Sequence, residues 1–322
     1  ENNIIKVYYT IRKDLYYTVH YYEENSTIQA APDKEVGGNT YHSQITESPI
    51  DIPGYTKVSN DSQTITIQVD ETQNVITFYY IKHAQMAQNT LIKNGPDKIT
   101  EENEVLEYTI TYTGLISGYK GNASITLVDT LPYQIDTNTW NLAGGTYNPD
   151  NRTITWTENL ENIDTNTNGD YPINITKTIR VSYTDTDYSN TTITNKVSGT
   201  INLARTEQEI SIPEAVKNTQ TEFTKEVTVT KVWNHTNNNY EIPTQVEVQV
   251  KNGETVENRQ IINEDNEIAE NTWSYTFTGL QKYDSQGQEI NYTVDETPVE
   301  EGDLEYYRKD INGNTITNTY IG

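Results

Sequence analysis

Apolar and polar side chains alternate with a period of two along most of this chain. This period is typical of β-strands that bury one face and expose the other. Isoleucine, valine, threonine and tyrosine, which favour strands, dominate the alternating segments. The clearest of these segments are residues 16–24, 64–69, 73–80, 106–112, 125–129, 193–197, 228–233, 292–296 and 315–320. The pattern predicts an all-β protein.

The chain is expected to fold as several domains. Its 322 residues exceed what one hydrophobic core usually supports. Residues 82–90 carry no alternation and are interpreted as a linker, as are residues 213–224. We therefore expect three tandem β domains, at residues 1–82, 83–222 and 223–322.

The first predicted domain contains an internal repeat. The sequence NNIIKVYY at 2–9 is nearly the same as QNVITFYY at 73–80. A unit of about seventy residues lies between them. Its V-x-Y-Y opening, its I-P-G-Y turn at 52–55 and its closing I-x-F-Y-Y strand resemble the mucin-binding-protein (MucBP) repeat, a β-grasp-like unit. Residues 1–10 are then either the last strand of a preceding repeat or an extra strand of this unit.

The 25 tyrosines of the chain bear on whether this unit binds a ligand. Exposed tyrosines on strands can stack on sugars, but their commonest role is packing across a sheet. For this unit we therefore favour a spacer over a glycan binder.

Three polar residues of the C-terminal segment share one predicted buried face. The alternation places Lys231 on the apolar face of 228–233, Glu296 on that of 292–296 and Asn318 on that of 315–320. A lysine inside an apolar sheet must be paired or lose its proton, and a neutral amine is a nucleophile. Each residue alone is commonly structural, so their convergence is what points to chemistry.

The motifs VTVTKVW, NTWSYTFTGLQKYDSQGQEINYTVDE and ITNTY of this segment resemble the collagen-adhesin B-type (Cna B-type) domain of Gram-positive surface proteins. The resemblance implies an Ig-like β-sandwich with a spontaneous isopeptide bond. It makes Lys231 the amine, Asn318 the amide and Glu296 the acid. Burial lowers the pKa of a lysine and raises that of a carboxylic acid, so such a pair can exchange a proton. The protonated acid would then polarise the amide carbonyl and help ammonia leave.

The middle segment carries a similar arrangement. The alternation places Lys93, Asp129 and Asn195 on apolar faces, and LIKNGP, EYTITYTG, VDTLP and ITNKVSG resemble the collagen-adhesin A-type (Cna A-type) isopeptide domains of pilins and adhesins. The resemblance implies a second Ig-like β-sandwich whose bond uses these three residues. Lys98 and Glu107 are the rival amine and acid, but Leu106 and Tyr108 place the apolar face opposite to Glu107, and Lys93 is favoured over Lys98. Asp129 has a further alternative, which is to cap a turn before Leu131-Pro132.

The composition of the chain excludes several classes of function. A net charge of −25 and a pI of about 4.4 argue against a nucleic-acid partner. The chain has no cysteine, so no disulfide can stabilise it, and isopeptide bonds would serve in their place. It has no apolar run of membrane-spanning length and no signal peptide. We interpret it as a fragment of a longer protein, with its export and anchoring signals outside this sequence.

Neither a metal nor a cofactor is expected. Residues 164–170 copy the first half of a calcium loop, but position twelve is Ile175 instead of glutamate, so a polar hairpin loop is the better interpretation. The four histidines have no metal-ligand spacing. No phosphate-loop, zinc or nucleophile-elbow motif is present.

The predicted function is structural. We expect a stalk segment of an adhesin or pilus-like protein on the wall of a Gram-positive bacterium, stabilised by self-formed Lys–Asn bonds. Each bond would form once, so the chain is not expected to be a turnover enzyme. The alternative is an adhesin module that binds host glycan, mucin or an extracellular matrix protein.

Overall fold

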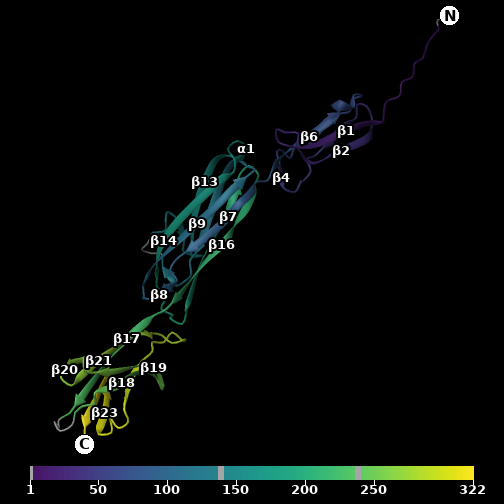
Figure 1. The fold of residues 1–322 in the computed structure, drawn as a ribbon. Helices are drawn as coiled ribbons and strands as arrows, with labels where there is room; N and C mark the ends of the chain where they lie inside the picture. Colours follow the sequence, from purple (N-terminus) through teal and green to yellow (C-terminus); the bar gives the residue numbers. More distant parts are fainter. Residues whose placement is uncertain (1–2, 137–140, 236–240) are drawn as a thin grey trace.

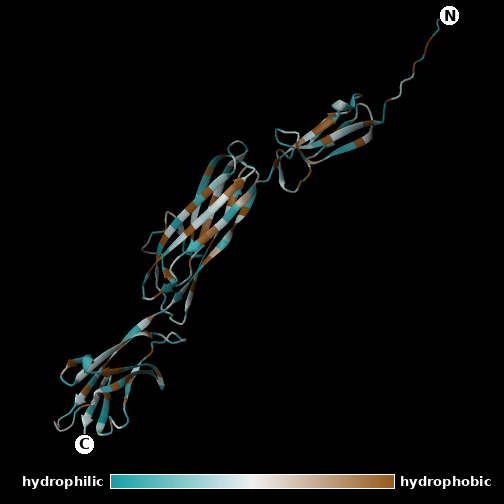
Figure 2. Ribbon diagram, in the orientation of Figure 1, coloured by the Kyte–Doolittle hydropathy of each residue, from teal (hydrophilic) through white to brown (hydrophobic). Residues whose placement is uncertain are grey.

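The chain folds into three β units arranged end to end (Figure 1). The computed structural model describes residues 3–136, 141–235 and 241–322. Each unit has a hydrophobic core of its own, drawn from residues 15–80, 84–223 and 227–316. Apolar and polar positions alternate along the strands, as the brown and teal bands of Figure 2 show. The all-β fold class is confirmed.

The N-terminal unit is built on a four-stranded sheet of order β2-β1-β6-β4, with a separate β3-β5 pair. Strands β1 and β6 are parallel neighbours at its centre. Tyr17, Tyr21 and Tyr80 are buried in its core, so packing is the role of these tyrosines. Its elements are β1 (Leu15–Glu23), β2 (Gln29–Asn39), β3 (Gln44–Glu47), β4 (Tyr55–Lys57), β5 (Gln63–Thr66), the 3-10 turn η1 (Glu71–Gln73) and β6 (Val75–Lys82).

The middle unit is a sandwich of two sheets. A six-stranded sheet of order β12-β13-β10-β15-β16-β8 packs on a four-stranded sheet of order β11-β14-β9-β7. Its elements are β7 (Gln85–Asn94), β8 (Lys98–Ile99), β9 (Val105–Ser117), β10 (Lys120–Thr130), β11 (Ile135–Asp136), β12 (Thr146–Asn148), β13 (Thr153–Asp164), α1 (Thr165–Asn168), β14 (Tyr171–Tyr183), β15 (Thr192–Leu203) and β16 (Gln208–Thr221).

The C-terminal unit is a second sandwich. A five-stranded sheet of order β20-β21-β17-β24-β23 faces a three-stranded sheet of order β19-β18-β22. Strands β17 and β24, the first and last of the unit, are parallel neighbours. Its elements are β17 (Thr224–Asn234), β18 (Gln245–Asn252), β19 (Thr255–Asn263), the 3-10 turn η2 (Glu264–Asn266), β20 (Glu267–Ala269), β21 (Thr272–Gln281), β22 (Thr293–Thr297), β23 (Tyr307–Asn312) and β24 (Thr315–Tyr320).

Both predicted linkers are wrong. Most of residues 82–90 belongs to β7, an edge strand that pairs with β9 but buries few side chains at this end, so main-chain pairing forms it without an alternating pattern. Most of residues 213–224 belongs to β16, which buries only Ile212 and Thr219. Pro213 is tolerated there because it lies at a register shift between β15 and β16.

Two details of the loops and termini also differ from expectation. Residues 164–170 do not form a hairpin loop, because they connect β13 and β14, which lie in different sheets. Asp164 caps α1 there and forms an ion pair with Lys120 at 2.8 Å. Residues 3–14 form no strand, so they are not an extra strand of the N-terminal unit.

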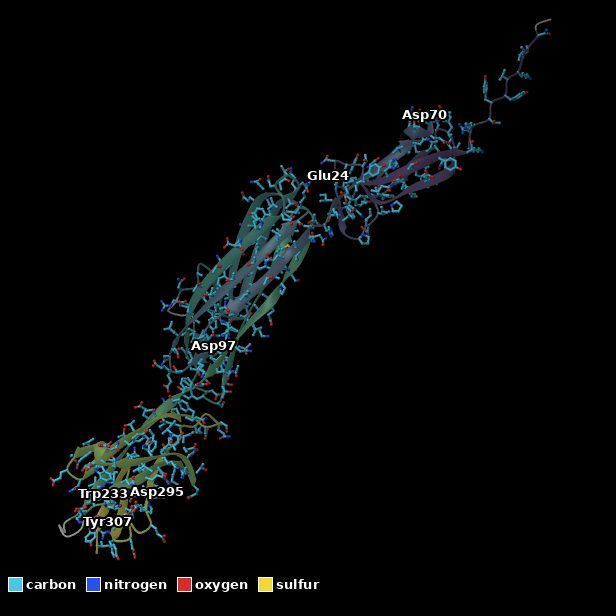
Figure 3. The ribbon with its side chains drawn as sticks, viewed as in Figure 1. Glu24, Asp70, Asp97, Trp233, Asp295 and Tyr307 are labelled. Atoms are coloured by element: carbon cyan, nitrogen blue, oxygen red, sulfur yellow. The ribbon has the colours of Figure 1, made fainter. Side chains whose placement is uncertain are left out.

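The units touch at their ends. Thr56 of the N-terminal unit donates a hydrogen bond to the Thr206 carbonyl at 2.7 Å, and Arg205 forms an ion pair with Glu24, which Figure 3 places at the end of this unit nearest the middle unit. Only His83 and Ala84 separate β6 from β7, and only Glu222 and Phe223 separate β16 from β17. Within the described ranges, no helix has the length and apolarity to cross a membrane.

Candidate functional site

Lys231 and Asn318 lie on adjacent parallel strands in the core of the C-terminal unit. The register pairs Lys231 with Ile316 and Trp233 with Asn318. Since side chains two residues apart share a face of a strand, Lys231 and Asn318 project into the same interior. Both residues are fully buried.

Glu296 reaches this interior from the opposite sheet. It lies on β22 and is 4% exposed. Its Oε2 is 3.0 Å from Lys231 Nζ, and both side chains are completely shielded from solvent. The structure therefore brings together the amine and the acid that the sequence predicted, with the amide on the neighbouring strand.

The apolar surroundings destabilise the protonated form of the Lys231 amine. Burial lowers its pKa from the usual value to about 8, although the carboxylate of Glu296 opposes this shift. The amine lies over the Trp233 ring, 4.1 Å from the ring centroid. Figure 3 shows Trp233 within this unit.

The Asn318 amide is unusual because it is buried without hydrogen bonds. In the described part of the chain, neither its oxygen nor its nitrogen has a hydrogen-bond partner, and apart from the ion pair with Lys231 the carboxylate oxygens of Glu296 have none either. A buried polar group without a partner costs roughly 1–3 kcal/mol. Such a cost calls for an explanation, and a chemical role for the amide is one.

The middle unit repeats this constellation with a shorter acid. Lys93 is on β7, Asp129 on β10 and Asn195 on β15, and all three are buried. Lys93 Nζ donates a hydrogen bond to Asp129 Oδ2. Asp129 is the register partner of Val197, so Asn195 lies two residues further along β15 on the same face. The acid and the amide thus share a sheet here, and the amine comes from the other sheet.

Burial shifts both titrating groups of the middle unit towards their neutral forms. It lowers the pKa of Lys93 and raises the pKa of Asp129, while their mutual attraction works against both shifts. Asn195 also acts on the Asp129 carboxyl and lowers its pKa, although within the described ranges neither atom of its amide has a partner in good hydrogen-bond geometry.

The rival residues lie elsewhere. Lys98 forms an exposed ion pair with Glu222 at 2.7 Å, and Glu107 is exposed beside Arg180. Asp129 lies within β10 with its side chain buried against Lys93, so it does not cap the following turn.

Sequence reasoning missed one contributor to the middle site. Lys93 Nζ lies 5.1 Å from the centroid of the Tyr108 ring, as Lys231 lies over Trp233. Tyr108 alternates with Leu106 and Ile110 on the apolar face of β9, so the signal that could have found it was present. In both units an aromatic face shields the buried amine.

The C-terminal unit also matches a known domain family. Residues 227–319 match the Cna protein B-type domain. The match confirms the resemblance predicted for this segment, whereas the MucBP and Cna A-type resemblances stay predictions. The chain is 38% identical over 107 residues to the collagen adhesin of Staphylococcus aureus, a stretch that makes up 33% of this chain and 8% of that protein.

Solved structures of pilins and adhesins align along the chain at low similarity. The full-length major pilin SpaD from Corynebacterium diphtheriae is 12% identical with a TM-score of 0.29, over 96% of this chain and 91% of that chain. Two B repeat units of the collagen binding protein of Staphylococcus aureus are 15% identical with a TM-score of 0.30, over 95% and 74% of the two chains. Neither likeness supports a statement about function.

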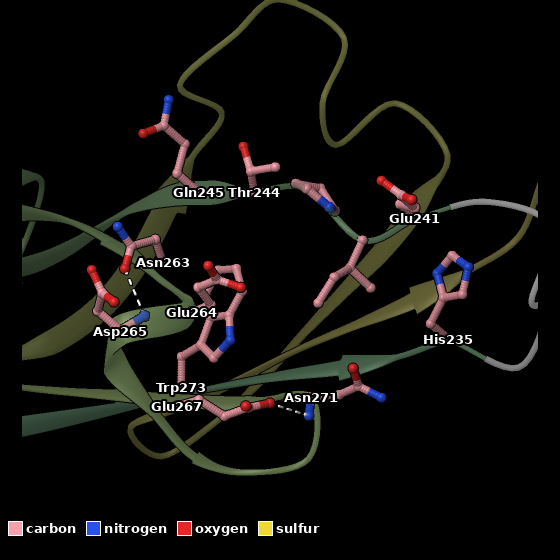
Figure 4. A pocket seen from close by; sticks show the side chains of 12 residues that line it. His235, Glu241, Thr244, Gln245, Asn263, Glu264, Asp265, Glu267, Asn271 and Trp273 are labelled. Carbon is pink, nitrogen blue, oxygen red and sulfur yellow. Dashed lines mark hydrogen bonds between the residues drawn. The ribbon is translucent and has the colours of Figure 1, made fainter.

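A groove of about 750 Å³ lies on the Cna B-matched unit (Figure 4). Its lining includes four carboxylates and the edge of the core at Trp273. Glu267 accepts a hydrogen bond from the Asn271 backbone at 3.0 Å, and the Asp265 backbone donates to Asn263 at 2.8 Å. Among the described residues, no cluster of acids and histidines could hold a metal ion.

Proposed function

We propose that this chain is a stalk segment of a Gram-positive surface adhesin or pilus-like protein, and that its two buried lysines form isopeptide bonds with Asn318 and Asn195. The observation that carries the proposal is the pairing of each buried lysine with a buried acid and an amide without hydrogen bonds. The match of residues 227–319 to the Cna protein B-type domain supports the adhesin or pilin class.

The reaction in the Cna B-matched unit follows from its groups. Lys231 transfers a proton to Glu296, which leaves a neutral amine beside a neutral acid. The Nζ atom attacks Cγ of Asn318 while the acid donates a hydrogen bond to the amide oxygen. The new bond joins Nζ to Cγ, and the bond from Cγ to Nδ2 breaks. Nδ2 takes the amine proton by way of Glu296 and leaves as ammonia, and the acid ends protonated.

The middle unit would use the same steps with Asp129 in the role of Glu296. Its amine, Lys93, starts in a hydrogen bond with the acid, so the first proton transfer needs no movement of the side chains. The reaction consumes the lysine and the asparagine, so each site acts once and the chain is not a turnover enzyme.

Position along the chain gives the bonds a mechanical role. Lys231 and Asn318 lie on the first and last strands of the C-terminal unit. Tension that enters at β17 and leaves after β24 would pass through the covalent link and would not load the strands between them. A domain closed in this way resists extension as well as heat.

Intact mass tests the proposal directly. The full chain should weigh two ammonia molecules less than its sequence mass. Glu296→Gln and Asp129→Asn should each restore one of them, and the double variant both. Peptide mapping should recover a branched peptide that contains Lys231 and Asn318. A parent protein at its full sequence mass would show that neither bond forms.

The alternative is a ligand-binding adhesin module that recognises host glycan, mucin or extracellular matrix protein. Its support is the collagen adhesin of Staphylococcus aureus, to which part of the chain is similar. Binding of the full chain to immobilised collagen and to mucin, compared with a bond-free Lys231→Met/Lys93→Met variant, separates the two functions. A stalk should bind neither surface.

A further inference from the structure

Residues 3–14 hold strand-forming side chains that no sheet covers. Ile4, Ile5, Tyr8 and Tyr9 are between 81% and 90% exposed, and Val7 is 62% exposed. Figure 1 shows this segment projecting from the N-terminal unit, away from the middle unit. A run of isoleucine, valine and tyrosine is expected to pair in a sheet, and exposing it costs stability and solubility.

The segment reproduces the inward positions of β6. In the repeat, Asn3, Ile5, Val7 and Tyr9 correspond to Asn74, Ile76, Phe78 and Tyr80. These four residues of β6 and its preceding turn are 0%, 1%, 4% and 1% exposed. Three of the four positions are identical, and the fourth exchanges one apolar side chain for another. The match therefore preserves the face that β6 buries.

The correspondence of Asn3 with Asn74 is the most specific part. The Asn74 amide donates to the carbonyls of Tyr16 and Gln68, both at 3.0 Å, and accepts from the Gln68 backbone at 2.8 Å. An asparagine that satisfies three buried backbone groups belongs to one place in the fold. Its recurrence at the same offset from the apolar run points to the same place in another unit.

The segment cannot occupy this place in its own unit. The β6 position is already filled, between β1 and β4. It is also parallel to β1, and only Thr10–Asp14 separate Tyr9 from the start of β1. A parallel neighbour needs a connection of about a dozen residues or more. The unit that accepts the segment must therefore be a different one.

We infer that Asn3–Tyr9 is a closing strand, built to fill the β6 position of a second unit of the kind formed by residues 15–82. The chain then passes through Thr10–Asp14 into β1, much as β6 passes through His83 and Ala84 into the middle unit. The partner of this surface is thus a copy of the N-terminal unit, and such units would be joined end to end. This inference does not depend on the isopeptide bonds.

Substituting the sequence of the N-terminal segment into β6 tests whether this segment can occupy the β6 position. Val75→Ile, Thr77→Lys and Phe78→Val convert residues 74–80 of the full chain into the sequence of residues 3–9. We expect slow amide hydrogen exchange to persist throughout residues 15–82, with a lowered melting temperature because Val fills less space than Phe. The middle and C-terminal units act as internal controls.

The matched control writes residues 4–10 into the same positions, which shifts the sequence by one residue. This shift places a lysine at the buried position 76, so protection within residues 15–82 should be lost. Loss of protection in the in-register variant, or equal protection in both variants, would overturn the inference.

A second experiment tests pairing between copies. Replacing residues 75–80 of the full chain by a glycine–serine run empties the β6 position but leaves the N-terminal segment intact. Light scattering after size exclusion should show concentration-dependent dimers and longer chains, in which the segment of one copy fills the empty position of the next. Adding Ile5→Lys and Val7→Asp should return the variant to a monomer. A monomer before those changes, or association that they do not reduce, would refute the inference.

Discussion

Tyr188 and Tyr283 stack face to face between the middle and C-terminal units, with ring centroids 4.0 Å apart and planes 11° apart. Phe223, which connects the two units, packs edge-on against both rings. Glu102 accepts hydrogen bonds from the Lys282 amine and the Tyr283 hydroxyl, both at 2.6 Å. These contacts form a joint between the two sandwiches.

Removing the Tyr283 ring should loosen the joint. In Tyr283→Ala the stack and one hydrogen bond to Glu102 are lost, so the angle between the two units should vary more widely. Small-angle X-ray scattering should show a broader distribution of interatomic distances, with the melting of each unit nearly unchanged. Tyr275→Ala, a change within the C-terminal unit, should leave the distribution as it is. An unaltered distribution for Tyr283→Ala would mean that the joint is held by other contacts.

Loss of the C-terminal bond should cost a large part of that unit's stability. The two residues are 318 − 231 = 87 positions apart. A cross-link over a loop of this length stabilises by about 4–5 kcal/mol in the chain-entropy model. Asn318→Ala should lower the free energy of unfolding of this unit by about that amount, measured by denaturant titration with Trp fluorescence. Asn314→Ala serves as the matched control, and an equal loss in both variants would argue against a cross-link.

A bond-free protein should become more stable as the pH rises from 8. The pKa of Lys231 falls to about 8 in the folded protein because the amine is buried, and it returns to its ordinary value on unfolding. Between these values the unfolded state binds more protons, so stability rises with pH, by roughly 3 kcal/mol in total.

The measurement compares Asn318→Ala with Asn318→Ala/Lys231→Met between pH 7.5 and 9.5. Subtracting the second stability profile from the first removes the pH dependence that tyrosines and other groups contribute equally to both variants. A rising stability in the first variant and a flatter profile in the second are expected. Parallel profiles would mean that Lys231 keeps its ordinary pKa in the fold.

The two bonds should protect their units from force to different extents. In the middle unit the bond would end on β15, so residues 196–221, which include β16, lie outside the closed loop. Pulling the wild-type chain at its ends should unfold the N-terminal unit and release residues 196–221 from the sheet, a gain of roughly 70–90 Å for this release at about 3.4 Å per residue.

Asn318→Ala should add a larger step for the C-terminal unit, and Asn195→Ala a larger step for the middle unit. Optical-tweezer traces count these steps. Identical step numbers in wild type and Asn318→Ala would show that the C-terminal bond carries no load.

The sequence by itself determined the fold class and the inward direction of the six site residues. A period of two is a local property of a strand, so the neighbours of Lys231, Glu296 and Asn318 were sufficient to place each on an apolar face. The same rule argued against Glu107, whose neighbours Leu106 and Tyr108 occupy the buried face of β9.

Only the tertiary structure decided which faces meet. The parallel pairing of β17 with β24, and the supply of Glu296 by the opposite sheet, join segments that are far apart in the chain. The periodicity of one strand does not indicate which other strand it pairs with, because main-chain hydrogen bonds between strands are largely independent of side-chain identity. For the same reason the first part of β7 and most of β16 went unrecognised, since main-chain pairing forms them while few of their side chains are buried.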